Sequence, residues 1–170
     1  MAKPERVIAI IKEELDESKR KFADARRTEL MVGEVISLER SRPLYEVGKE
    51  GLAALSGQDG EMTEALRRIQ LLHADFRGFL ETAAPNSFDV IYFDPMFRYP
   101  VKRKENSIEG FRSAAVYDPL TEDVLQFAMR AARKKVIVKE RPFSALFRTG
   151  LFTEIHGKRG QTTAYGVIKL

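Results

Sequence analysis

Short apolar runs alternate along this chain with longer stretches in which apolar residues recur at helical spacing. The runs predict strands at residues 34–39, 69–74, 90–93 and 135–139, because short runs of high β-propensity are typical of strands buried on both faces. The periodic stretches predict helices that begin near Ser41, near Phe76 and at Asp118-Pro119. Residues 152–156 and 163–170 predict a terminal β-hairpin. The alternation indicates an α/β fold with a mostly parallel sheet covered on both sides and an antiparallel pair at its end.

The first residues of the chain fit two different patterns. Val7, Ile11 and Leu15 would share one face of a helix that begins at Pro4 and continues to about residue 27. The β-branched run Val7–Ile11 is also compatible with a strand. We predict the helix.

The composition indicates one domain. A chain of 170 residues, 44% hydrophobic and 32% charged, is long enough for a core and too polar for a membrane span. We therefore treat residues 1–170 as a single domain, with an N-terminal helical segment at 1–30 and a core at 32–170. The N-terminus lacks the apolar stretch of a signal peptide, so we expect the cytoplasm. The absence of cysteine excludes disulfides and thiol catalysis.

The strand at 90–93 ends abruptly in Asp94-Pro95-Met96-Phe97, at the edge where open α/β sheets bind ligands. Pro95 has no N–H, so this turn offers a carbonyl acceptor next to a carboxylate. Two acceptors and an aromatic ring suit a planar group that carries an NH2, such as the exocyclic amine of a nucleobase. The alternative is a structural Asp-Pro turn that only ends the strand.

Basic residues follow this turn, with aromatic residues between them. The net charge of +4 and the pI near 9.3 favour a polyanionic partner, and the clustering favours RNA, because phosphate contacts combined with stacking hold unpaired bases. The candidate substrate-binding residues are Arg98, Lys102, Arg103, Lys104 and Arg112.

Strands that end in Glu39, in Asp75-Phe76 and in Asp94-Pro95-Met96-Phe97, with a closing hairpin, resemble the class I S-adenosylmethionine-dependent methyltransferases. The sequence DVIYFDPMF, with ARKKVIVKE downstream, resembles more narrowly the bacterial enzymes that methylate guanine N2 in small-subunit ribosomal RNA, and their uncharacterised relatives. The resemblance covers about Val32 to Leu170 and implies a Rossmann-like sheet. It also implies S-adenosyl-L-methionine as cofactor and ribosomal RNA as substrate.

The resemblance assigns a role to each strand end. Glu39 would accept hydrogen bonds from the ribose hydroxyls of the cofactor, Asp75 would accept from its adenine amine, and Phe76 would lie against the ring. Asp94, also at the cofactor, and the Pro95 carbonyl would bind the substrate amine. Met96 stands where amino-methyltransferases commonly carry a second proline, and Phe97 would stack on the base. A solvated strand-end acid is the alternative for Glu39, and a helix cap is the alternative for Asp75.

Methyltransferases of this class carry a Gly-rich turn after their first strand, and this chain has no glycine before Gly33. We therefore expect the first strand and the Gly-rich loop to be missing, with an unfilled strand position near residues 27–32. If so, the chain could be a methyltransferase-like RNA-binding module without activity. An amine methyltransferase that acts on a protein or a small molecule is the third possibility.

The remaining candidates are weaker. His73 and His156 are the two histidines, and without cysteine or clustered carboxylates they make a poor zinc site, so we expect no metal. Lys139 and Glu140 lie where the strand at 135–139 ends; they either border the pocket or form a strand-end ion pair. The sequence indicates no membrane partner and does not determine the oligomeric state.

Overall fold

A computed structural model of the chain describes residues 6–11, 34–56, 63, 66–95, 119–157 and 161–170, with residues 6–11 described by their backbone. Within these ranges no helix is long and apolar enough to cross a membrane.

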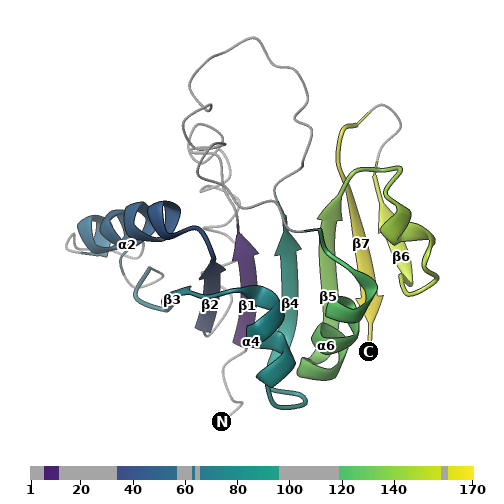
Figure 1. The fold of residues 1–170 in the computed structure, drawn as a ribbon, viewed down its shortest axis with the longest axis horizontal. Coiled ribbons are helices and arrows are strands. Elements are labelled where there is room, and N and C mark those ends of the chain that lie inside the picture. Colours follow the sequence, from purple (N-terminus) through teal and green to yellow (C-terminus); the bar gives the residue numbers. More distant parts are fainter. Residues whose placement is uncertain (1–5, 12–33, 57–62, 64–65, 96–118, 158–160) are drawn as a thin grey trace.

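The fold is built on a seven-stranded sheet (Figure 1). The strands lie in the order β3-β2-β1-β4-β5-β7-β6, and the first five of them run parallel to one another. The strands are β1 (Arg6–Ile11), β2 (Glu34–Glu39), β3 (Ile69–His73), β4 (Phe88–Asp94), β5 (Ala132–Glu140), β6 (Glu154–His156) and β7 (Ala164–Lys169). The antiparallel strands β6 and β7 close the sheet as the sequence predicts, and the α/β, mostly parallel architecture is confirmed.

The first strand of the sheet is present, so the expectation that it is missing was wrong. Arg6–Ile11 is a strand and not part of a helix, and it pairs in parallel with β2 on one side and β4 on the other. Ile8, for example, is in register with Ile36 and with Ile91. A strand in this position supplies hydrogen-bond partners to two neighbours that would otherwise lack one, which outweighs a helical spacing of apolar residues. The remainder of the expected helix, residues 12–27, lies outside the described residues.

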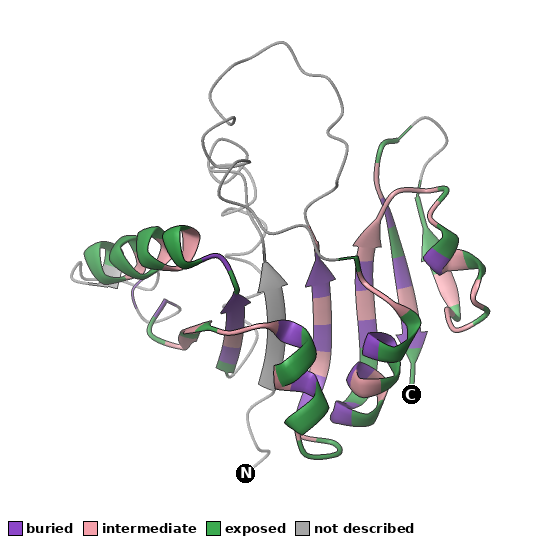
Figure 2. Cartoon of the chain, viewed as in Figure 1, coloured by how far each residue is buried: buried purple, intermediate pink, exposed green. Residues whose placement is uncertain are grey.

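Two helices cover one face of the sheet, α4 (Phe76–Thr82) and α6 (Glu122–Ala131), and Figure 1 shows them side by side. Helix α6 begins at Glu122 with Thr121 as N-cap. The start expected at Asp118-Pro119 was therefore too early, since Pro119 and Leu120 are not helical. Its inward face, which consists of Val124, Leu125, Ala128 and Ala131, is fully buried. Figure 2 shows the matching alternation of buried positions along β4 and β5.

The remaining helical elements lie toward the ends of the sheet. Helix α2 (Arg42–Ser56) begins next to Ser41 as predicted, and it contacts β2 and β3. Val47 and Leu55 on its expected apolar face are 47% and 39% exposed, so this stripe is only partly covered. The short 3-10 helix η1 (Ala145–Arg148) follows β5 and precedes the hairpin.

Candidate active site at the carboxyl edge of the sheet

The acidic residues predicted as site residues lie at one edge of the sheet. Glu39 is the last residue of β2, Asp94 is the last residue of β4, and Asp75 follows β3 by two residues. These strands run parallel with β1, and Ile11 at the end of β1 is in register with Asp94. The carboxyl ends of parallel strands meet at one edge, so the three acids share the edge where such sheets bind ligands.

Asp94 is held by two neighbours on one side of its carboxylate. Its Oδ2 accepts a hydrogen bond from Lys139 Nζ at 2.8 Å, and the Tyr92 hydroxyl donates to the same oxygen at 3.5 Å. The side chains of Asp94 and Lys139 are each 12% exposed. Of the two alternatives for Lys139, the structure therefore shows the strand-end ion pair, with Asp94 as the partner. Among the described residues no hydrogen bond ends on Oδ1.

Glu39 is not the solvated acid of the alternative interpretation, because it is only 5% exposed. Its Oε1 accepts from the Ser41 backbone N–H at 2.6 Å, and its carbonyl oxygen accepts from the Ala74 N–H at 3.1 Å. The first contact fixes the carboxylate at the start of α2, and the second joins the ends of β2 and β3. A buried, oriented acceptor suits hydroxyl donors, although its role toward a ribose stays a prediction.

Asp75 caps helix α4, as its alternative interpretation proposed. Its Oδ1 accepts from the backbone N–H groups of Arg77 and Gly78 at 3.0 and 3.2 Å. Its Oδ2 lies 3.4 Å from Arg40 Nη1 in a half-exposed ion pair. One oxygen is thus committed to the helix end, and an adenine amine could reach Asp75 only through Oδ2.

A cavity of about 410 Å³ lies beside these strand ends, between β3, α4 and the start of α6. Arg77 lines this cavity and donates hydrogen bonds to Asp123 and Thr121. Hydrogen bonds from Arg77 and then Thr121 lower the pKa of Asp123 to about 2. Phe76 borders the cavity but is 7% exposed, with its ring packed edge-on against Phe93 at 6.0 Å between centroids. The cavity is lined by Arg40, Asp75, Phe76, Arg77, Pro119 and Thr121.

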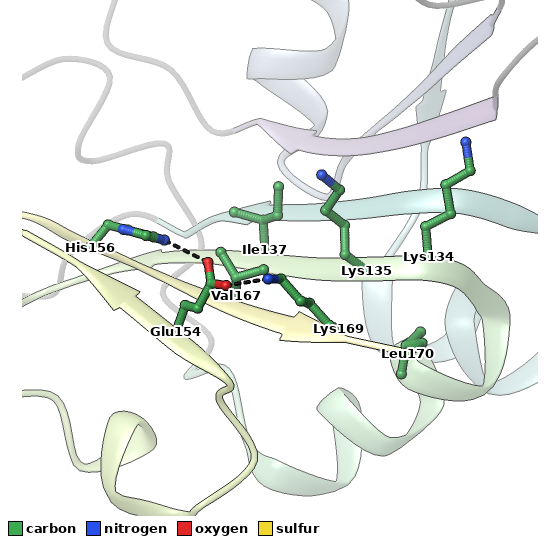
Figure 3. A pocket seen from close by; sticks show the side chains of 8 residues that line it. All are labelled: Lys134, Lys135, Ile137, Glu154, His156, Val167, Lys169 and Leu170. Atoms are coloured by element: carbon green, nitrogen blue, oxygen red, sulfur yellow. Dashed lines mark hydrogen bonds and ion pairs between the residues drawn. The ribbon is translucent and has the colours of Figure 1, made fainter.

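A second cavity, of about 500 Å³, lies on the β5–β7–β6 part of the sheet and is rich in basic side chains (Figure 3). Glu154 is the one acidic side chain among the described residues that line it. Glu154 accepts hydrogen bonds from Lys169 and, at 3.0 Å, from His156, and these two bases lower its pKa. Lys135 makes no ion pair within the described residues. The lining residues are Lys134, Lys135, Ile137, Glu154, His156, Val167, Lys169 and Leu170.

The sequence interpretation missed this basic cavity, although the run Arg133-Lys134-Lys135 signalled it. The pairing of β4 with β5 shifts register between Phe88 and Val90, where three β5 residues span the length of two β4 residues. An extra residue in one strand interrupts the alternation of side chains between the two faces of a sheet. Three successive exposed bases at this point follow from that irregularity.

Several predicted site residues lie outside the described residues, so their roles stay predictions. They are Met96 and Phe97 of the strand-end motif and the basic residues Arg98, Lys102, Arg103, Lys104 and Arg112. Pro95 is described and half-buried, directly after Asp94.

Comparison with known sequences relates most of the chain to one family. The family described as "Putative SAM-dependent methyltransferase" matches residues 30–161. The uncharacterized protein YpiP of Bacillus subtilis is 32% identical over 137 residues, which cover 81% of this chain and 52% of YpiP. A stretch of 39 residues, 23% of this chain, is 77% identical to part of a DNA gyrase protein from Streptococcus pyogenes serotype M1 and covers 5% of that protein.

Solved structures share the fold at low sequence identity. The SAM-dependent methyltransferase NGO1261 of Neisseria gonorrhoeae aligns with a TM-score of 0.59 at 17% identity, over 98% of this chain and 61% of that one. SMU.1697c of Streptococcus mutans, solved in complex with SAH, aligns with a TM-score of 0.56 at 10% identity over 98% and 88%. The rRNA methyltransferase AviRa of Streptomyces viridochromogenes aligns with a TM-score of 0.52 at 13% identity over 98% and 76%. This chain thus spans about half the length of YpiP and three-fifths of NGO1261.

Proposed function

This chain belongs to the family of SAM-dependent methyltransferases, and we propose that it methylates an exocyclic amine of a nucleobase in RNA. Guanine N2 of ribosomal RNA is the specific target that we propose, and the cytoplasm is the proposed compartment. The observation that carries the proposal is Asp94, a nearly buried carboxylate at the end of β4 whose Oδ2 is held by Lys139 and whose Oδ1 has no partner among the described residues. Pro95 follows it and contributes a carbonyl without a competing N–H.

The proposed chemistry depends on two acceptors beside the amine. A nucleobase amine is a poor nucleophile because its lone pair is delocalised into the ring. Asp94 Oδ1 and the Pro95 carbonyl would accept its two N–H bonds, which favours a pyramidal nitrogen and frees the lone pair for attack. S-adenosylmethionine, when bound, supplies the methyl group on a positively charged sulfur. As the nitrogen gains the methyl group it becomes acidic, and Asp94 or a water would take one proton.

The residues at the edge fit the adenosine part of this cofactor. Glu39 is a buried acceptor suited to hydroxyl groups, and Asp75 Oδ2 is an acceptor beside a cavity of about 410 Å³. Arg40 would have to release Asp75 Oδ2, and their separation of 3.4 Å at a half-exposed position makes that exchange inexpensive. The segment that follows β1, where this class carries its Gly-rich turn, lies outside the described residues.

The basic cavity supports RNA as the partner. Lys134, Lys135 and Lys169 line this cavity, and Glu154, the one acidic side chain among its described lining residues, is paired with Lys169 and His156 (Figure 3). These lysines are part of the excess of basic residues that gives the chain its net charge of +4. RNA phosphates bind basic side chains whatever the base sequence. This cavity would therefore help to hold RNA, while Asp94 and Pro95 at the end of β4 select the base. The structural likeness to the rRNA methyltransferase AviRa agrees with this substrate class.

The direct test is methyl transfer from labelled S-adenosylmethionine to undermodified small-subunit ribosomal RNA. Asp94→Asn should lower kcat at least tenfold with little change in cofactor affinity, because the amide can turn a donor toward the substrate N–H. Glu50→Gln, at an exposed position of α2, is the matched control and should retain wild-type turnover. An Asp94→Asn enzyme with unchanged kcat would remove Asp94 from the mechanism.

The second candidate is an RNA-binding module that has the fold and lacks the activity. The observation that favours it is the absence of glycine from residues 1–32, where a Gly-rich turn would let the backbone approach the cofactor. Calorimetry with S-adenosylhomocysteine separates the two candidates. Saturable binding supports the enzyme, whereas RNA binding without any S-adenosylhomocysteine binding supports the module.

A further inference from the structure

Lys139 brings a positive charge to the place where the substrate amine would dock. Its Nζ lies 2.8 Å from Asp94 Oδ2, and both side chains are 12% exposed. Lys139 forms no second ion pair within the described residues, so its charge is matched to Asp94. The neighbouring Glu140 is turned to the backbone instead, where its Oε1 accepts from the Arg141 N–H at 2.7 Å.

We propose that Lys139 makes this site selective for a neutral aromatic amine and excludes protonated alkylamines, such as lysine side chains and small aliphatic amines. The inference rests on the proposed function and narrows its substrate class. Lys139 is in this view a positioning residue for Asp94 and a specificity determinant. Its charge would favour the methylation of a nucleobase amine over the methylation of a protein or small-molecule amine.

The argument starts from the charge of the two kinds of amine. An aliphatic amine is an ammonium ion at neutral pH, whereas the exocyclic amine of a nucleobase is uncharged. An isolated, nearly buried carboxylate would attract the ammonium ion most strongly, and that ion has no lone pair with which to attack a methyl group. Without Lys139, Asp94 would therefore bind alkylammonium ions, which cannot be methylated.

The ion pair removes this attraction. Lys139 already neutralises the carboxylate, and an ammonium ion on Oδ1 would lie within a few ångströms of the Lys139 charge. At an effective dielectric of about 20, like charges at about 5 Å weaken binding by roughly ten- to a hundredfold, allowing for partial exposure. A neutral amine meets no such repulsion and still finds Oδ1 as an acceptor.

Lys139 also fixes which oxygen faces the substrate. Lys139 and Tyr92 both donate to Oδ2, so the rotamer of Asp94 is held and Oδ1 is the oxygen left for the amine. Loss of this orientation should appear in kcat more than in KM, because acceptor geometry matters most as the nitrogen becomes pyramidal.

The test compares Lys139→Met, Lys139→Gln and Lys139→Arg with the wild type, and uses 1-butylammonium as the charged probe at neutral pH. Binding of the probe is measured by titration monitored by NMR, which needs no turnover, and as inhibition of methyl transfer to RNA. Lys49→Met, at an exposed position of α2, is the control for loss of one lysine. Gln serves as the second neutral variant because it can still donate to Asp94 and keep the protein folded.

We expect 1-butylammonium to bind at least tenfold more tightly to the Met and Gln variants than to the wild type. The Arg and Lys49→Met variants should match the wild type. On RNA, Lys139→Met should lower kcat more than it changes KM, and Lys139→Arg should restore it. Equal affinity of the probe for the wild type and both neutral variants overturns the inference.

Different results would contradict the proposed function and the role of Lys139. If the folded wild type transfers no methyl group to RNA, the proposed function is lost, and the titration with 1-butylammonium still decides the role of the Lys139 charge. If the wild type methylates RNA and the titration shows no difference between variants, only the role of Lys139 is lost.

Discussion

Gly166 in β7 occupies a position with no room for a larger residue. A Cβ built on it would lie 2.6 Å from Phe147 Cε1 and closer still to the ring of Phe152. These two rings pack edge to face, with centroids 5.1 Å apart and planes at 88°, so neither can move without disturbing the other. Gly166 is also in register with Val138, next to Lys139. We predict that Gly166→Ala destabilises the protein and disturbs the strand that carries Lys139.

The magnitude follows from two opposing terms. Forcing a methyl group into a packed site costs about 1–3 kcal/mol, and replacing a strand glycine by alanine returns about 0.5–1 kcal/mol of backbone entropy. The net loss is about 1 kcal/mol of unfolding free energy at the middle of these ranges, and at most about 2.5 kcal/mol. With a urea m-value of about 2 kcal/mol/M, the unfolding midpoint should fall by roughly 0.5 M, and by at most about 1.25 M.

Gly51→Ala is the matched control for this substitution. A Cβ at Gly51, in the middle of α2, meets nothing within 4 Å. The same change should therefore raise stability by about 0.5–1 kcal/mol there, because alanine favours the helix. Urea unfolding followed by circular dichroism measures both variants. A Gly166→Ala protein as stable as the wild type would refute the packing argument, because the rings of Phe147 and Phe152 would then move aside for the methyl group at no cost in free energy.

Three further predictions concern the site and its surroundings. Phe97→Ala should weaken RNA docking by about 1–3 kcal/mol, the usual scale of base–aromatic stacking, and equal RNA affinities would exclude Phe97 from the base contact. Neutralising the basic run Lys102–Lys104 should weaken RNA binding and flatten its dependence on salt; an unchanged slope would make the run a solvated surface. Asp123→Asn should lower stability at neutral pH, because Arg77 depresses the pKa of the folded carboxyl from 3.8 to about 2. The contribution of Asp123 is then complete above pH 3.8 and lost as the pH falls toward 2, so thermal unfolding of variant and wild type should converge there, and a constant difference would contradict it.

Much of the sheet could be predicted because most of its strands carry their own signals. The run that became β4 combines β-branched and aromatic residues and stops at an Asp-Pro pair, and β2 follows Gly33 and ends at Glu39. Such local features do not depend on partners elsewhere in the chain. The helix that begins at Glu122 was predicted to start earlier, because Pro119 is compatible with a first helical turn and also with extended backbone.

The burial and the hydrogen-bond partners of the acidic residues depend on tertiary structure and could not be predicted from the sequence. Nothing in the sequence near Glu39 indicates that it is buried, since burial comes from the packing of the β2 end against the start of α2. Asp75 was equally compatible with a cap and a ligand acceptor; the structure shows the cap through Oδ1 and an ion pair of Oδ2 with Arg40, and its role toward a ligand stays a prediction. The partner of Lys139 is Asp94, 45 residues away in sequence, and only the register of β4 with β5 brings them together.

The central strand shows why spacing alone is insufficient evidence for a helix. Val7 and Ile11 are four residues apart, which suits one helical face, but Val7–Ile11 is also an uninterrupted apolar run of the kind that a strand buried on both faces requires. The deciding information lies outside the segment. Strands β2 and β4 each have one edge that needs a partner, and no other described segment pairs with those edges. The backbone hydrogen bonds of two strands, each costly to leave unpaired when buried, therefore depend on Arg6–Ile11, and this requirement outweighs the local helical pattern.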